Sequence, residues 1–63
     1  MNLEKIKSLM SAQKVTQAEL ASATGTSQAF ISYVMDGTKM PSVAVLKSIA
    51  DRLGVTMDEL VRT

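Results

Sequence analysis

Residues 17–37 read QAELASATGTSQAFISYVMDG, and this stretch decides the fold. Thr16, just before it, and Glu19 form the Thr-x-x-Glu pattern of a capping box, which begins a helix. Gly25 ends that helix, because glycine adopts positive φ at little cost. Ser27 is a preferred N-cap for a second helix, which runs to Asp36 with Gly37 following it. The stretch therefore predicts two short helices joined by a three-residue turn.

The spacing of the residues inside this stretch indicates that the two helices cross closely. Ala21 is small enough for the backbones to approach, and Gly25 turns the chain four residues later. Ile31 and Val34 are branched apolar residues that can lock the second helix against the first. This arrangement matches the helix-turn-helix motif, over about residues 17–36.

Three more helices are expected outside the motif, and no strand. Asn2 caps a first helix with apolar spacing up to Gln13. Pro41 and Ser42 begin a fourth helix that stops at Gly54, and TMDE at 56–59 is a second capping box that begins a fifth. The apolar stripe of the fourth helix is expected to comprise Val43, Leu46, Ile49, Ala50 and Leu53. The fold class is therefore all-α with five helices.

Composition excludes several classes of protein. A chain of 63 residues that is 46% apolar is expected to form a single domain, residues 1–63. It contains no Cys and no His, and its carboxylates form no convincing acid–base pair, so we expect no metal, no cofactor and no catalysis. The longest apolar run, VAVL, favours a soluble, cytoplasmic protein. A chain this short leaves no room for a sensor domain, which favours regulation by concentration alone.

These features resemble the Cro/C1-type helix-turn-helix domains of phage repressors and related bacterial regulators. The resemblance extends from Leu3 to Leu60 and includes QAELA, IS, the DG helix stop, PS and IADRLGVTMDEL. It implies a compact five-helix fold like that of lambda repressor. It also implies a small transcriptional regulator, expected to be a repressor, that places its third helix in the major groove of double-stranded DNA.

The resemblance places four residues of the third helix where the family reads bases: Gln28, Ala29, Ser32 and Tyr33. Gln28 can pair through two hydrogen bonds with adenine, and Ala29 can touch a thymine methyl group. Each has an alternative role: Gln28 and Ser32 as solvated surface residues, Ala29 as a helix former, and Tyr33 as a partial cover for the core. Phe30 is expected to be half-buried, with DNA contact as its alternative.

Residues on either side of this helix are expected to contact phosphate groups. They are Gln17 at the start of the second helix, Ser27, Thr38, Lys39 and Ser42. Free N–H groups and the helix dipole favour an anion at Gln17. Lys14 and Lys47 are weaker candidates, with a solvated surface charge as the alternative for each.

Two departures from the family pattern change the expectations. Many members pair an Arg and an acidic residue where this chain has Met10 and Met35, so we predict that these two side chains touch, within about 6 Å. The third helix also has no basic residue and carries Asp36, and the net charge is only +1. Binding by one copy is therefore expected to be weak and sensitive to salt.

A homodimer on two half-sites about 34 Å apart would recover affinity. Possible dimer contacts are Val55, Met57, Leu60 and Val61, with packing against the chain's own core as the alternative. The modest charge also leaves a second function open, because fold alone does not fix function. The chain could instead be a protein-binding module on the same fold, such as an antitoxin-like or accessory subunit.

Overall fold

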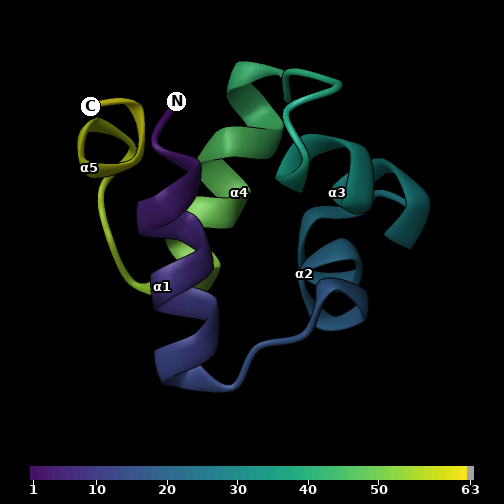
Figure 1. Cartoon of the computed structure of the whole chain (residues 1–63), viewed down its shortest axis with the longest axis horizontal. Helices are drawn as coiled ribbons and strands as arrows, with labels where there is room; N and C mark the ends of the chain where they lie inside the picture. The colour runs from purple at the N-terminus through teal and green to yellow at the C-terminus, as the bar shows by residue number, and fades with distance from the viewer. Residues whose placement is uncertain (63) are drawn as a thin grey trace.

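A computed structural model describes residues 1–62, and this part of the chain contains five α-helices and no strand (Figure 1). The helices are α1 (Leu3–Gln13), α2 (Gln17–Thr24), α3 (Gln28–Met35), α4 (Val43–Leu53) and α5 (Met57–Val61). The expected all-α fold class and the number of helices are confirmed.

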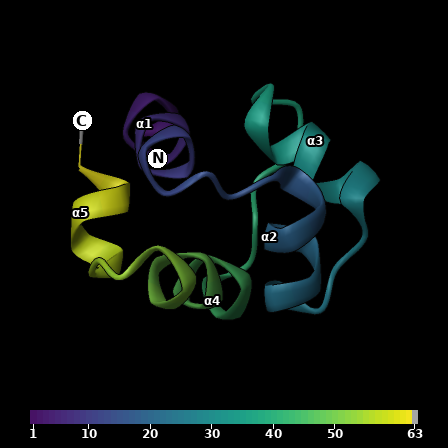
Figure 2. The same cartoon turned by 90° about the horizontal axis from the view of Figure 1, so that it is seen from below.

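The helix α4 lies at the centre of the packing and contacts α1, α2 and α5 (Figures 1 and 2). The helix α3 instead packs mainly on α2, so these two helices form a unit on one side of the molecule, opposite α5 (Figure 2). The core between the helices consists of apolar side chains, and no polar or charged side chain among residues 1–62 is buried. It contains Ile6, Met10, Val15, Leu20, Ala21, Ile31, Val34, Met35, Leu46, Ile49, Ala50, Leu53 and Leu60.

Four of the helices follow the N-cap that the sequence predicts, and α4 begins at Val43, after Ser42, two residues later than the predicted start at Pro41. The side chains of Asn2, Thr16, Ser27, Ser42 and Thr56 each accept a hydrogen bond from a backbone N–H group in the first turn that follows. These bonds satisfy donors that a helix leaves without an internal partner. Both capping boxes are complete.

Three of the connections between the described helices share one geometry: 14–16, 25–27 and 54–56. The first residue of each is left-handed, with φ of 56° at Lys14, 69° at Gly25 and 75° at Gly54. The N–H group of the second residue bonds to the carbonyl five positions earlier, at 2.8 to 3.0 Å. The third residue is the Thr or Ser that caps the next helix. The sequence predicted the two glycine stops but not the one at Lys14.

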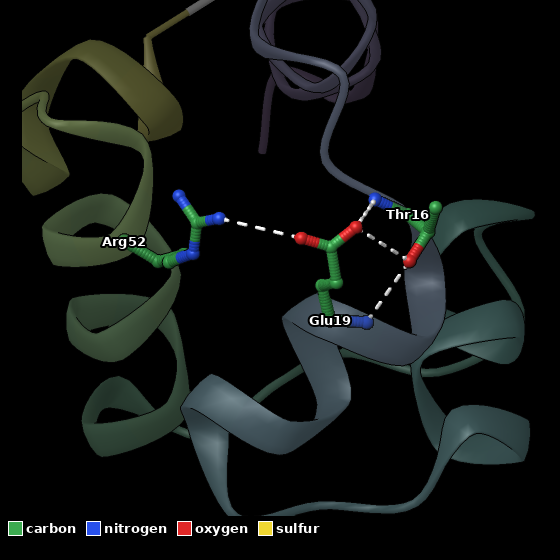
Figure 3. A network of polar contacts seen from close by, with 3 residues as sticks. All are labelled: Thr16, Glu19 and Arg52. Atoms are coloured by element: carbon green, nitrogen blue, oxygen red, sulfur yellow. Dashed lines mark hydrogen bonds and ion pairs between the residues drawn. The ribbon is translucent and has the colours of Figure 1, made fainter.

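The carboxylate of Glu19 links the start of α2 to α4 (Figure 3). Its Oε1 atom accepts from the Thr16 backbone N–H at 3.4 Å and lies 3.2 Å from the Thr16 hydroxyl. Its Oε2 atom lies 3.7 Å from Nη2 of Arg52 on α4. A second link joins α1 to α4, where the Gln13 amide donates to the Leu53 carbonyl at 2.7 Å. A hydrogen bond from α1 and an ion pair from α2 therefore each connect to α4 outside the apolar core.

The core differs from the predicted one at α4 and agrees with it at the two methionines. Val43 is 74% exposed, so its predicted place in the apolar stripe was wrong; it is the first residue of α4, and the buried side chains of this helix begin at Leu46. Met10 and Met35 are both buried in one continuous cluster. If an apolar contact between Met10 and Met35 replaces the ion pair found in many members of the family, both side chains have to be buried, as they are here. Direct contact between the two side chains stays a prediction.

Candidate nucleic-acid interface

The helix α3 has one buried face and one exposed face. Its buried face consists of Ile31, Val34 and Met35, which pack into the core, and Phe30 is half-buried beside them as expected. All four predicted base-reading residues are exposed: Gln28, Ala29, Ser32 and Tyr33. Helical periodicity thus gathers an amide, a methyl group, a hydroxyl and a phenol on one surface.

The turn before α3 is held by side-chain hydroxyl groups as well as by backbone. The Thr24 hydroxyl donates to the Leu20 carbonyl at 2.9 Å and lies 2.8 Å from the Thr26 hydroxyl. Gly25 between them is left-handed, and a Cβ there would meet nothing within 4 Å, so its backbone conformation alone explains the glycine. These bonds stabilise the end of α2 and the turn that leads to α3.

Ser27 and Ser42 cap their helices and still have a donor to offer. The Ser27 oxygen accepts from the Phe30 N–H at 3.0 Å, and the Ser42 oxygen accepts from the Val45 N–H at 3.2 Å. Capping uses an oxygen lone pair and leaves the hydroxyl hydrogen available. Both residues are exposed, so each can donate to an external acceptor.

The loop after α3 folds back onto Tyr33. The Tyr33 carbonyl accepts from the N–H groups of Thr38 and Lys39, at 2.9 and 3.2 Å. The Lys39 ammonium lies 5.2 Å from the centroid of the Tyr33 ring. Gly37, with φ of 82°, allows the chain to reverse. A loop residue expected to contact phosphate and a helix residue expected to read bases are therefore in direct contact.

Asp36 is bonded inside this loop. Its Oδ1 atom accepts from the Thr38 N–H at 2.9 Å. The Thr38 hydroxyl and then its backbone N–H, together with the charge of Lys7, lower the pKa of Asp36 below its ordinary value of 3.8. Asp36 is thus a carboxylate at neutral pH, and the donors of Thr38 are directed at it.

The basic side chains divide into two groups. Lys47, Arg52 and Arg62 form ion pairs with Asp51, Glu19 and Asp58. Lys47 is exposed and paired with Asp51, which agrees with the alternative to phosphate contact, a solvated surface charge. Lys39 has no ion pair among residues 1–62 and lies beside α3. Lys7 was not predicted to lie near this site, because its charge acts on Asp36 only through the folded chain, in which Leu3 at the start of α1 lies beside Gly37.

A comparison with protein-family models decides the classification. The model described as "Helix-turn-helix" matches residues 6–60. The chain belongs to this family. The helix-turn-helix unit proper is α2, residues 25–27 and α3, and the match supports the Cro/C1-type resemblance drawn from the sequence. Helix-turn-helix domains of this kind bind DNA and are not a catalytic family. Comparisons with curated proteins and with solved structures gave no match.

The other residues predicted to contact phosphate groups differ in their exposure to solvent. Gln17 is half-buried at the first position of α2, while Thr38 and Lys39 are exposed. Among residues 1–62 no helix has the length and apolar character needed to cross a membrane.

The group expected to form dimer contacts needs one correction. Leu60 is fully buried, so it belongs to the chain's own core and is not available to a second copy. Val55 and Met57 are half-buried and pack against the same core. Val61 is 46% exposed and is the most accessible of the four. The alternative role, closure of the chain's own core, therefore describes Leu60 correctly.

Proposed function

We propose that this helix-turn-helix protein binds double-stranded DNA sequence-specifically, as a small transcriptional repressor with α3 in the major groove. The observation that carries the proposal is the exposed face of α3, whose four side chains face solvent while the opposite face is fixed in the core. An α-helix fits the major groove, where each base pair presents a distinct pattern of donors and acceptors.

The chemistry of the exposed face suits this role. Gln28 is the first residue of α3, and its amide can donate to N7 and accept from N6 of an adenine. Ala29 beside it can touch a thymine methyl group. Ser32 can donate or accept and so discriminates little, while Tyr33, 45% exposed, can reach a base edge or a phosphate group. We assign most of the sequence preference to Gln28.

Phosphate groups are proposed to bind on either side of α3. Ser27 and Ser42 offer hydroxyl hydrogens, Lys39 offers its charge, and Gln17 lies where the N–H groups of α2 begin. Thr38 is exposed and is proposed to contact a phosphate group as well, while its backbone N–H shapes the loop through its bonds to Asp36 and Tyr33. These contacts would set the register of the protein on DNA without reading its sequence.

We propose that two copies act together on half-sites about 34 Å apart. One copy offers little positive charge to DNA, because three of the seven Lys and Arg residues form ion pairs and the net charge is only +1. One copy therefore neutralises few phosphates, so its binding is expected to be weak, with a salt slope set by that small number of phosphate contacts. Cytoplasmic localisation is an expectation that follows from this partner.

Selection of bound duplexes from a random library, followed by titration of the selected duplex, tests the proposal. Gln28→Ala is expected to weaken binding to that duplex by about 1–3 kcal/mol and to relax preference at one base position. Lys39→Ala is expected to weaken all duplexes similarly and to reduce the salt slope by about one. Ser11→Ala, at an exposed position on α1 with no proposed contact to DNA, serves as a surface control.

Two results would contradict the proposal. If Gln28→Ala and Lys39→Ala have the same effect on every sequence, the division between base-reading and phosphate-binding residues is wrong. If the wild-type protein selects no duplex even at low salt, the function as a protein-binding module gains the support that DNA binding loses.

A further inference from the structure

Tyr33 makes contacts that its place on α3 does not require. Its carbonyl accepts two loop N–H groups, from Thr38 and Lys39, and its ring lies under the Lys39 ammonium at 5.2 Å. These two backbone bonds hold residues 38 and 39 of the loop against α3. The ring is also a contact partner for the end of the Lys39 side chain, which is otherwise exposed and has four rotatable bonds.

We propose that Tyr33 is a positioning residue for Lys39, and that the two side chains act on DNA as one unit. The inference rests on the proposed function and adds to it a coupling between base-reading helix and phosphate-binding loop. An ammonium group over a ring still has donors for a phosphate oxygen, because only one side of it faces the ring. The face of the ring, not its hydroxyl, provides the effect.

The surroundings of the pair support this assignment. Asp36, Gly37 and Thr38 give the loop a fixed turn, so Lys39 begins from a defined backbone position. Lys39 forms no ion pair among residues 1–62, so within that range no carboxylate competes with the ring for its charge. Orienting a flexible cation before binding reduces the entropy lost when DNA is bound.

A double-mutant cycle measured on the selected duplex tests the coupling. The single variants are Tyr33→Leu and Lys39→Met, with Tyr33→Phe as the conservative control. We expect Lys39→Met to weaken binding about two- to fivefold more in the wild-type background than in the Tyr33→Leu background. In the Tyr33→Phe background its effect should equal that in the wild type, since the ring remains.

NMR spectra of the free protein provide a readout that needs no DNA. The Lys39 side-chain methylene protons nearest the ammonium should show an upfield ring-current shift in the wild type and in Tyr33→Phe, and lose it in Tyr33→Leu. Backbone amide shifts outside residues 33–39 report whether each variant keeps the fold.

The outcomes separate the coupling from the proposed function. Additive effects of the two substitutions on DNA affinity, or a coupling that Tyr33→Phe abolishes, overturn the positioning role while leaving DNA binding intact. A wild-type protein that binds no duplex overturns both. A shift that persists in Tyr33→Leu shows that the ring does not orient Lys39, and it overturns this inference alone.

Discussion

Lys14 is the one residue other than glycine with positive φ in the part of the chain that the structure describes. It holds the same left-handed place after α1 that Gly25 holds after α2 and Gly54 holds after α4. A side chain with a Cβ is disfavoured there by roughly 1–2 kcal/mol. The sequence gives no sign of it, because the stop depends on bonds to the end of α1 and on burial of Val15.

Replacing Lys14 by glycine is expected to stabilise the protein by about 0.5–1 kcal/mol. Relief of the left-handed strain exceeds the extra entropy that glycine has in the unfolded chain, and the exposed Lys14 side chain loses little packing. Urea unfolding followed by circular dichroism measures the change. Lys14→Ala is the control, because it removes the charge and keeps the strain. A lower stability for Lys14→Gly than for the wild type would contradict the argument.

The lowered pKa of Asp36 should make the free energy of unfolding depend on pH in the acidic range. Its pKa in the folded protein is lowered, chiefly by hydrogen bonds from Thr38, so its charged form stabilises the fold. That contribution is complete above the ordinary pKa of 3.8 and is lost as the pH falls through the lower folded pKa. The difference in unfolding free energy between wild type and Asp36→Ala should therefore shrink below pH 3.8. A difference that grows toward acid pH would show that the carboxylate is not stabilised by this loop.

At the scale of the element, α2 begins with a complete capping box, in which the carboxylate of Glu19 has a second partner on α4. Glu19 completes the capping box with Thr16 and reaches Arg52 on α4 (Figure 3). Exposed ion pairs contribute little, whereas the loss of an N-cap costs about 1 kcal/mol. The cap should therefore matter more than the ion pair.

Three substitutions separate these two roles of the α2 start. Thr16→Ala is expected to lower the unfolding free energy by about 1 kcal/mol, and Thr16→Ser to leave it nearly unchanged. Glu19→Gln keeps a capping side chain and loses the charge, so it should cost less than about 0.5 kcal/mol. Chemical unfolding ranks all three. If Glu19→Gln costs more than Thr16→Ala, the ion pair with Arg52 governs instead.

Local chemistry explains why the helices were predictable and why parts of the site were not. Caps such as Ser27 and stops such as Gly25 act within a few residues, so the sequence shows them directly. Periodicity likewise placed Gln28 on the exposed face of α3. Contact between Tyr33 and Lys39, in contrast, depends on how the loop folds back. The DNA contacts themselves stay predictions.

At the scale of the whole molecule, Leu60 is a core residue and not the dimer contact that the sequence allowed. This residue is 0% exposed and closes the core from α5, a helix of only five residues. The sequence could not separate this role from a dimer contact, because an apolar residue on a short terminal helix suits both. Small domains bury a limited fraction of their surface, so each core residue contributes a large share of stability.

Leu60→Ala is expected to destabilise the protein by about 2–5 kcal/mol, through lost burial and the cavity that remains. Val61→Ala, at the adjacent position that is 46% exposed, is the matched control and should change stability by less than about 0.5 kcal/mol. Thermal and urea unfolding measure both. Equal effects of the two substitutions would mean that α5 does not close the core.

The backbone N–H of Asn2 donates to the carbonyl of Leu60 at 2.6 Å, so the start of α1 and α5 lie side by side, across the molecule from α3 (Figure 1). A dye, an affinity tag or a second folded unit attached near Asn2 or after α5 would accordingly lie on the side of the molecule that carries α5, away from α3 (Figure 1). The same proximity favours cyclisation of the chain through a short spacer, because a short loop costs little closure entropy when the segments that it joins already lie close together in the fold.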